Sequence, residues 1–366
     1  MKISIGSKII DGPFGGGNEY LKNLVEFLST KGHEIVTHLN DKDIDIILLT
    51  SPFINSETGT FSNYDIDYYQ KFINKNAISF QRVNECDERK NTKDINSYII
   101  NSNKNIDVTF FVSEWLKNLF TELNYFKECF VVKGGPSSKI FNMNNKKLLS
   151  SGEKVKLVTH HWSNNLMKGF EEYRALDDLL SDPKFSNKYE FTYIGNVPKN
   201  FKFKNTKLIN PLHSTSLSSE LKKHHIYITG SKNEPSGNHH MEGAMCGLPI
   251  LYVESGALPE YCREYGRSFS SKSLSEALEE VVKNYNFYIE KLNYYPYSFE
   301  SSAEFLLDKF TYYLNEKENI ISNRSNLNGC KVIYNWLKFN FKKKSIKIYY
   351  AIRIFFGKVK LIFVKI

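Results

Sequence analysis

Several features that define other protein classes are absent from this sequence of 366 residues. Its five cysteines are odd in number and form no Cys-x-x-Cys pair, which favours free thiols in a reducing compartment. No run of 18 apolar residues occurs, and this argues against a simple membrane-spanning helix. The first ten residues, MKISIGSKII, lack a long apolar stretch, so we expect no secretory signal.

Two motifs of cofactor and metal enzymes are also missing. Glycines at the GxGxxG spacing do not open a helix after a strand, which argues against a nicotinamide-dependent dehydrogenase. The zinc-binding pattern HExxH is absent as well. His239 and His240 are adjacent, and adjacent helical side chains point about 100° apart. We therefore expect no metal site and no cofactor.

Acidic residues are absent from the end of the chain. After Glu318 there is no Asp or Glu, whereas nine Lys and two Arg give this stretch a formal charge of +11. Since the whole chain carries +9, the first 318 residues carry −2. Positive charge confined to one segment argues against nucleic-acid binding by the folded part, and we expect no nucleic-acid partner.

The remaining composition is that of a folded α/β protein. With 366 residues, 41% of them hydrophobic, the chain is long enough for two cores. β-like runs such as DIDIILLT alternate with amphipathic patterns such as NEYLKNLVEFLSTKG over the first 150 residues, and the alternation starts again near Lys154. This pattern predicts two doubly wound, Rossmann-like domains with parallel sheets.

We therefore divide the chain into four segments. Residues 1–150 form a first Rossmann-like domain and residues 151–295 a second, joined by a stretch rich in Gly, Ser, Asn and Lys. Residues 296–318 contain one further helix, and residues 319–366 form a basic aromatic tail. Open parallel sheets bind ligands at the carboxyl ends of their strands. We therefore expect a ligand site in a cleft between the two facing domains.

Two strand-to-helix turns carry residues suited to anion binding. Gly15, Gly16 and Gly17 follow the first strand and would let a ligand approach a helix N-terminus, although a plain flexible loop has the same composition. Lys168 follows the first strand of the second domain, near the positive end of a helix. A cation gains nothing locally there, so a phosphate contact is favoured over a solvated surface position.

A third turn is NEPSGNHHMEG, residues 233–243. Asn238 is expected to cap a helix that has Glu242 in its first turns, and Glu234 lies in the turn before it. The helix N-terminus between the two acids can hold a diphosphate, and a carboxylate can accept two hydrogen bonds from a diol. From the spacing alone, a loop acid and an unrelated helix-dipole Glu explain the pair better.

Together these motifs resemble GT-B fold glycosyltransferases of the family 4 type (glycosyl transferases group 1). EPSGNHHME matches the family's E-x7-E pattern, and MEGAMCGLPILYVESGALPEYC is similar to its E-A-M-A-x-G-x-P-V segment. VVKGGPSSKIF stands where the family crosses between domains, and YSFESSAEFLLDKFTYYL is similar to the closing helix that crosses back to the first domain. The resemblance runs in order over residues 1–316.

The resemblance implies a role for each of these residues. Glu234 would contact the donor sugar and Glu242 the ribose hydroxyls, while Lys168 would contact the diphosphate of a nucleotide-sugar and the loop of residues 15–17 would cover it. The residues at the helix start would complete the donor site: Gly237, Asn238 and His239.

The sequence departs from the family before Lys168. The family has Gly-Arg a few residues before its lysine, whereas HHWSNN occupies that place here. We therefore expect His161 or Asn164 to share the phosphate contacts. The crossover also lacks the family's Asn and Asp, which leaves the donor sugar open.

The acceptor side is expected in QRVNECDERK, the most charged stretch of the first domain, which follows the strand AISF. The sequence does not decide whether the polar residues of this stretch enter the cleft or belong to a solvated loop. These residues are Arg82, Asn84, Glu85 and Asp87.

The tail forms an amphipathic pattern when it is plotted as a helix from Ser345. One side is apolar and consists of Ile348, Tyr349, Ile352, Phe355, Phe356, Val359 and Phe363. The other side is basic and consists of Lys343, Lys344, Lys347, Lys358 and Lys365. This profile predicts that residues 331–366 bind an anionic membrane surface. A helix docked on the protein's own core is one alternative, which eleven positive charges without an acid fit poorly. RNA binding is another, and the continuous apolar stripe argues against it.

The function implied is that of a retaining glycosyltransferase, which moves a sugar from a nucleotide-sugar to a hydroxyl of a glycan or glycolipid. We expect a role in cell-surface polysaccharide or glycolipid synthesis, with the enzyme peripheral at the cytoplasmic face of the membrane. Two alternatives remain. A GT-B nucleotide-sugar 2-epimerase needs no acceptor, and a non-catalytic GT-B scaffold would have no use for Glu234, Glu242 and Lys168.

Overall fold

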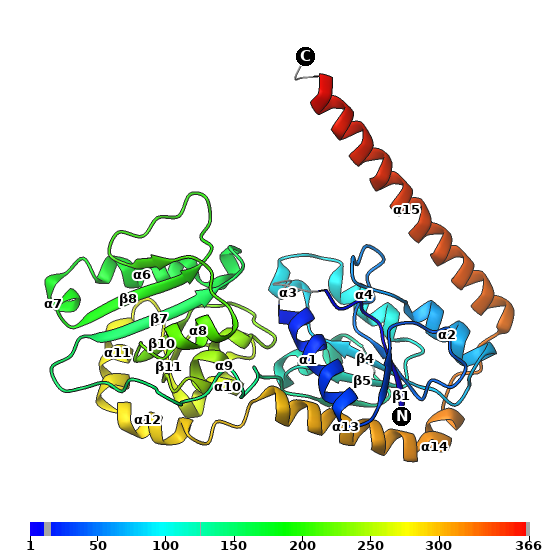
Figure 1. The fold of residues 1–366 in the computed structure, drawn as a ribbon, viewed down its shortest axis with the longest axis horizontal. Coiled ribbons are helices and arrows are strands. Elements are labelled where there is room, and N and C mark those ends of the chain that lie inside the picture. Colours follow the sequence, from blue (N-terminus) through cyan, green and yellow to red (C-terminus); the bar gives the residue numbers. More distant parts are fainter. Residues whose placement is uncertain (11–15, 125, 364–366) are drawn as a thin grey trace.

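The computed structural model describes residues 1–10, 16–124 and 126–363, with the side chains of residue 347 and of residues 350–363 outside the description. The chain forms two parallel sheets that lie side by side along the long axis of the molecule, each covered by helices (Figure 1). The predicted fold class, an α/β chain with two doubly wound Rossmann-like domains, is confirmed.

The first sheet has six strands in the order β2-β1-β3-β4-β5-β6, all paired in parallel. β3, with the sequence IILL, is buried throughout, as expected for a strand with helices on both faces of its sheet. The strands are β1 (Lys2–Ile5), β2 (Glu34–Val36), β3 (Ile46–Leu49), β4 (Ile78–Val83), β5 (Val108–Phe111) and β6 (Cys129–Val131). The helices are α1 (Gly16–Thr30), α2 (Asn63–Phe72), α3 (Asp87–Lys90), α4 (Ile95–Asn103) and α5 (Glu114–Leu123).

The second sheet also has six parallel strands, in the order β12-β11-β10-β7-β8-β9. Its strands are β7 (Val155–His161), β8 (Tyr189–Gly195), β9 (Lys207–Ile209), β10 (Ile226–Thr229), β11 (Ile250–Tyr252) and β12 (Gly266–Ser268). Its helices are η1 (Leu166–Lys168), α6 (Phe170–Leu179), α7 (Pro183–Ser186), α8 (Ser214–Leu221), α9 (Asn238–Met245), α10 (Leu258–Cys262), η2 (Arg263–Tyr265), α11 (Leu274–Lys283) and α12 (Tyr285–Leu292).

The strand order of the second sheet reverses between β7 and β10, which are neighbours in the sheet but distant in sequence. From β7 the chain runs outward through β8 and β9, then returns to β10 on the other side of β7. The connections that follow β7 and β10 therefore leave toward opposite faces of the sheet, and this topological switch point is where open parallel sheets bind ligands. Lys168 follows β7 and Glu234 follows β10, so the topology places both at the switch point.

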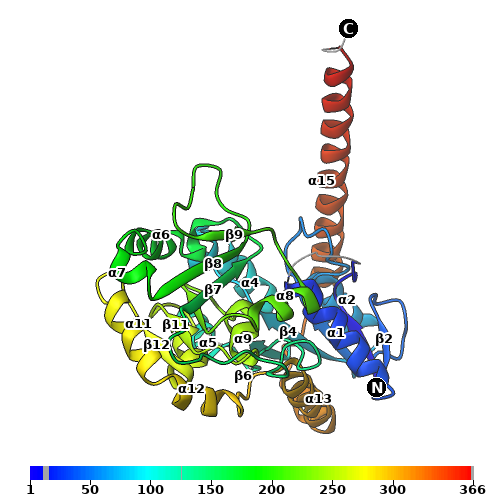
Figure 2. The same ribbon diagram turned by 60° about the vertical axis from the view of Figure 1, so that its left-hand side comes forward.

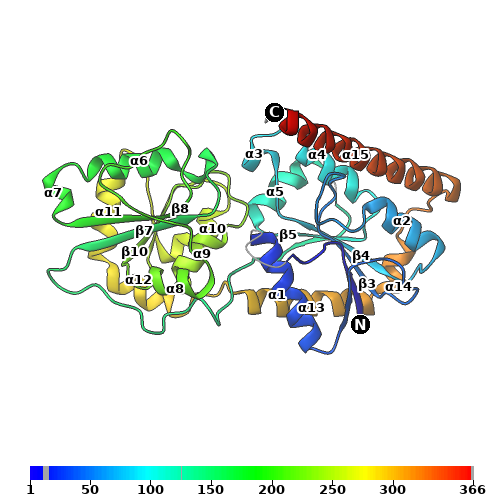
Figure 3. The same cartoon turned by 45° about the horizontal axis from the view of Figure 1, so that its top comes forward.

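The chain crosses between the domains twice. After the second domain, α13 (Phe299–Asn315) returns beneath the first, and its apolar face enters the first core beside Ile3 and Phe80 (Figures 1 and 3). The two crossing segments touch, because a Cβ at Gly135 would lie 2.4 Å from the Tyr297 carbonyl oxygen. Phe299 N also donates to Pro136 O at 2.9 Å.

The segment after α13 begins against the first domain. α14 (Lys317–Ser322) is followed by Arg324, whose guanidinium bonds both carboxylate oxygens of the buried Asp107 at 2.7 and 2.8 Å. α15 (Gly329–Phe363) then packs its first turns on α2: the Trp336 indole donates to Asp65 at 2.8 Å and stacks on Tyr68 with ring centroids 4.8 Å apart. The helix therefore starts well before Ser345, and its beginning is docked on the protein itself.

The rest of α15 leads away from both domains (Figures 1 and 2). Apolar side chains are exposed on its described part: Phe341 is 75%, Ile348 59% and Tyr349 60% exposed. No helix in the described ranges has both the length and the apolar character needed to cross a bilayer.

Candidate functional site

The candidate site lies where the N-termini of α9 and α1 approach each other from opposite domains. A Cβ on Gly16, at the start of α1, would lie 3.8 Å from the side-chain nitrogen of Asn238, the first residue of α9. α1 begins on the side of the first domain that faces the second (Figure 3). A helix N-terminus has N–H groups without an intrahelical partner and a partial positive charge, so an anion between these two helix ends would be stabilised from two sides.

Glu234 forms the centre of the site. It is 7% exposed, and one of its oxygens, Oε2, lies 3.0 Å from Lys168 Nζ and 3.1 Å from a terminal nitrogen of Arg89. Burial raises the pKa of Glu234, but the two cations outweigh it and lower that pKa to about 2. Burial lowers the pKa of Lys168, and Glu234 opposes that shift. The carboxylate is therefore ionised at neutral pH.

Two glycines allow Glu234 and Lys168 to meet. Gly169, with φ +93°, ends η1 so close to β10 that a Cβ would lie 2.3 Å from the carbonyl carbon of Gly230. Gly256, with φ +61°, packs on the backbone of Glu234, where a Cβ would lie 2.4 Å from the nitrogen. A side chain at either position would combine a strained backbone with a clash. The turns after β7 and β10 are thus held close together.

Glu242 lies on α9 and points back to the end of β7. Its Oε2 is 2.6 Å from Nε2 of His160, whose Nδ1 lies 3.1 Å from the Tyr227 hydroxyl. The side chain of Glu242 remains 16% exposed, so one face stays accessible. Glu234 and Glu242 therefore stand on either side of the N-terminus of α9, each already held by a basic side chain.

Three further histidines near this pair are buried: His161, His239 and His240. His161 lies beneath the site, 2.6 Å from the Tyr173 hydroxyl, and His239 is 2.9 Å from Thr229 Oγ1. Burial lowers the pKa of both well below the usual value, and lowers that of His240 to about 3. Alternate residues of a strand face opposite sides, so His160 faces Glu242 and His161 faces Tyr173. The phosphate contact expected of His161 stays a prediction.

The other predicted donor-side residues fall into three groups. Asn164 lies on the exposed loop of residues 162–165. Gly237, rather than Asn238, is the N-cap of α9, so the predicted cap is wrong by one residue. Gly16 and Gly17 form the first turn of α1, and Gly15 lies outside the described residues.

The four predicted acceptor-side residues are placed around α1 and α3. The Arg82 guanidinium lies under α1, 4.3 Å from the ring centroid of Tyr20. Asp87 accepts hydrogen bonds from the backbone nitrogens of Ile95 and Asn96 at 2.9 and 3.0 Å, and so holds the start of α4. Two further residues follow β4: Glu85 pairs with Lys90 at 3.0 Å, and Asn84 is half-buried.

Arg89 is the residue that the sequence analysis missed. It belongs to the same charged stretch, on α3 of the first domain, yet it reaches across to Glu234 of the second. The side-chain nitrogen of Asn233 donates to the Glu88 carbonyl at 3.2 Å and reinforces this contact between the domains. The sequence offered one indication of this role: Arg89 lies in QRVNECDERK, the charged stretch that was already expected to face the acceptor.

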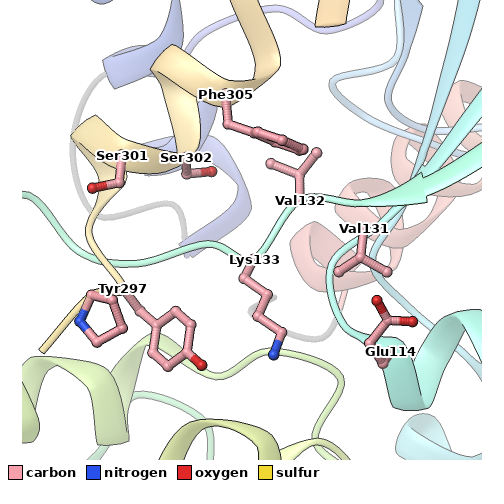
Figure 4. A pocket seen from close by; sticks show the side chains of 9 residues that line it. Glu114, Val131, Val132, Lys133, Tyr297, Ser301, Ser302 and Phe305 are labelled. Carbon is pink, nitrogen blue, oxygen red and sulfur yellow. The ribbon is translucent and has the colours of Figure 1, made fainter. Parts of the chain in front are cut away.

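A second contact between the domains lies at the start of α5. The Glu260 carboxylate accepts hydrogen bonds from the backbone nitrogens of Glu114 at 3.0 Å and Trp115 at 2.6 Å, and pairs with Lys133 at 3.4 Å. Lys133 also lies beside the Tyr297 ring and lines a pocket of about 270 Å³ near the crossing segments (Figure 4). The pocket shares no lining residue with the Glu234 and Glu242 site.

Within the described ranges, no three His, Cys, Asp or Glu side chains are grouped so that they could hold a metal ion. The site is therefore described by its two carboxylates, its cations and the two helix N-termini. Its chemistry is that of a receptor for a polyol joined to an anion, because carboxylates accept hydrogen bonds from hydroxyls while N–H groups and cations bind phosphate.

Comparison with solved structures identifies the architecture. Sucrose-phosphate synthase from Thermosynechococcus elongatus is 12% identical with a TM-score of 0.62, and covers 86% of this chain and 99% of its own. Anabaena HepE in complex with UDP and glucose is 10% identical with a TM-score of 0.58, covering 85% and 99%. AviGT4, a glycosyltransferase of avilamycin A biosynthesis, is 12% identical with a TM-score of 0.58, covering 86% and 98%.

These likenesses show that the chain has the GT-B fold, as its motifs predicted. At such low identity the likeness concerns the fold alone. No protein-family model and no curated protein matches the sequence.

Proposed function

We propose that this protein is a retaining glycosyltransferase that moves a sugar from a nucleotide-sugar to a hydroxyl acceptor. One observation carries the proposal: Glu234, with its two cations, and Glu242 flank the N-terminus of α9, opposite the N-terminus of α1. A diphosphate between the two helix ends would place a sugar toward one carboxylate and a ribose toward the other. The UDP and glucose bound by HepE, which shares the fold, support a donor of this kind.

The reaction would depend on electrostatic stabilisation more than on a protein nucleophile. As the bond between the anomeric carbon and the diphosphate oxygen breaks, negative charge grows on the leaving diphosphate. Lys168 and the two helix N-termini would offset this charge in a site partly shielded from water. The acceptor oxygen forms the new glycosidic bond and passes its proton to the departing diphosphate, so the products are the glycoside and the nucleoside diphosphate. The proposal involves no resident metal or other cofactor.

We also propose that the protein acts at a membrane surface. α15 leads away from both domains and exposes Phe341 and Ile348, and the chain after Glu318 carries eleven positive charges and no acid. Apolar and basic side chains together favour binding to anionic lipid. A membrane-bound glycan or glycolipid acceptor fits this arrangement, as does a role in cell-surface polysaccharide or glycolipid synthesis at the cytoplasmic face.

A thermal-shift screen with UDP, GDP and ADP and their sugar conjugates tests the donor. A ligand that binds only the folded state raises the melting temperature, by an amount that grows with the logarithm of its concentration relative to Kd. We expect one base to stabilise the protein and its sugar conjugate to be consumed only with an acceptor. A screen in which no nucleotide raises the melting temperature would reject the proposal. Epimerisation of the donor sugar without an acceptor would indicate the epimerase instead.

A further inference from the structure

The cations around Glu234 outnumber the carboxylate. Arg89 and Lys168 bind the same oxygen of one Glu, so the trio carries one net positive charge. The side chains of Arg89 and Glu234 are each 9% exposed and that of Lys168 is 16% exposed. A charge buried without a counter-charge is costly, so a site of this kind gains stability when an anion enters it.

The guanidinium of Arg89 has an unused hydrogen-bond donor. One terminal nitrogen bonds Glu234, while the other, Nη1, is buried and has no hydrogen-bond partner within the described ranges. A guanidinium presents its N–H groups in a planar fork that matches the oxygens of phosphate. The unused nitrogen is thus a second observation, independent of the charge balance, that points to an anionic ligand beside Glu234.

The second domain offers no comparable cation in the segment before Lys168. Residues 160–165, HHWSNN, contain neither Arg nor Lys. His161 is buried against Tyr173, and Asn164 lies on an exposed loop. Lys90, next to Arg89, is half exposed and pairs with Glu85. Arg89 is therefore the cation that stands with Lys168 at the carboxylate.

We infer that Arg89 is the second phosphate-binding cation of the donor site, supplied by the first domain across the cleft. The inference rests on the proposed function. When a donor binds, Nη1 of Arg89 bonds an oxygen of its diphosphate, while the other terminal nitrogen and Lys168 keep the Glu234 carboxylate oriented to accept a sugar hydroxyl. Since Arg89 and Lys168 belong to different domains, diphosphate binding and the closed arrangement of the domains stabilise each other.

Calorimetric titration of the full-length protein tests this assignment. The probes are UDP, GDP or ADP, whichever stabilises the wild type, and the matching nucleoside. Arg89→Ala should lower the affinity for the diphosphate by roughly tenfold to a hundredfold, the range for a hydrogen bond to a charged group, and leave that for the nucleoside unchanged. Arg89→Lys should restore part of the loss. The control is Lys90→Ala, which removes an exposed charge from the same helix and should lower the affinity for the diphosphate far less than Arg89→Ala does.

The results separate this inference from the proposed function. If the wild type binds a nucleoside diphosphate and Arg89→Ala binds it equally well, Arg89 only neutralises Glu234 and the inference is overturned. Equal losses for the diphosphate and the nucleoside would indicate a structural role and overturn it too. A wild type that binds no nucleoside diphosphate rejects both proposals. Arg89→Gln, close in size to the native side chain, replaces Arg89→Ala if the latter does not fold.

Discussion

His160 and Glu242 are joined by a contact of 2.6 Å that links the end of β7 to α9 across the topological switch point. The imidazole fixes one carboxylate oxygen of Glu242 and leaves the side chain partly accessible. Glu234 is held in the same way by Lys168, 3.0 Å away. The two acids thus have defined orientations before any ligand arrives, which lowers the entropic cost of recognising a diol.

The first prediction separates the roles of the two acids. Glu242→Ala should weaken binding of the nucleoside diphosphate, because the ribose loses its hydrogen-bond acceptor. Glu234→Ala should not weaken binding of the nucleoside diphosphate, because Arg89 and Lys168 remain available to its phosphates. It should lower turnover of the intact donor, because the sugar loses its carboxylate contact. Titration with the nucleoside diphosphate and initial rates with the donor measure both effects. Equal loss of diphosphate affinity in the two variants would contradict this division.

The second prediction concerns Lys168. Lys168→Ala removes a charge-assisted interaction worth about 1.5–3 kcal/mol. Turnover should fall more than donor affinity, because the charge on the diphosphate grows as its bond to the sugar breaks. Lys223→Ala is a matched control, since Lys223 is exposed and pairs with Glu220 at 2.7 Å outside the trio. Steady-state kinetics of both variants test this, and unchanged turnover in Lys168→Ala would assign the residue a structural role only.

The site could be predicted from the sequence where a single domain determines it. Lys168 and Glu234 follow adjacent strands of one sheet, so their meeting follows from the strand–helix pattern. Arg89 reaches Glu234 only because the domains pack in one particular way, and no local pattern specifies that packing. The choice between His160 and His161 depends on strand phase, where a shift of one residue reverses the face.

The tail shows a similar limit. Its helical, basic and apolar pattern was visible in the sequence, but the docking of Trp336 on Asp65 joins residues 271 positions apart. Asp65 itself belongs to a capping box with Ser62 at the start of α2. Composition alone therefore could not divide residues 319–366 into a docked part and a projecting part.

The third prediction concerns stability at acid pH. Burial lowers the pKa of His240 to about 3, against 6.5 for an ordinary histidine, and both of its ring nitrogens lack a hydrogen-bond partner within the described ranges. Between these two values the unfolded chain binds a proton that the folded protein does not. The stability contributed by the neutral ring is therefore complete above pH 6.5 and is lost as the pH falls toward 3.

Replacement of His240 by Leu should remove this dependence. At most one proton is involved, so the slope of unfolding free energy against pH should become shallower by up to about 1.4 kcal/mol per pH unit within that window. Urea unfolding of the wild type and His240→Leu at several pH values measures the difference. The slopes should coincide above pH 6.5, and identical slopes below it would show that the folded protein also protonates this ring.

The last prediction concerns the projecting part of α15. Deleting residues 341–366 should leave a folded protein, because the cut falls after Trp336 and keeps its contacts with Asp65 and Tyr68. A cut before residue 331 would expose this surface of α2 and should cost stability.

Full-length protein should sediment with vesicles of anionic lipid at low salt, and the shorter chain should not, since the apolar and basic side chains that contact lipid are gone. Lys342→Glu with Lys344→Glu in the full-length chain tests the electrostatic part alone, and should weaken binding without altering the melting temperature. Binding should also weaken as salt rises, because exposed charges are screened. If full-length protein stays in the supernatant with anionic vesicles at low salt, the membrane role is rejected and the proposal of a membrane-bound acceptor loses its support.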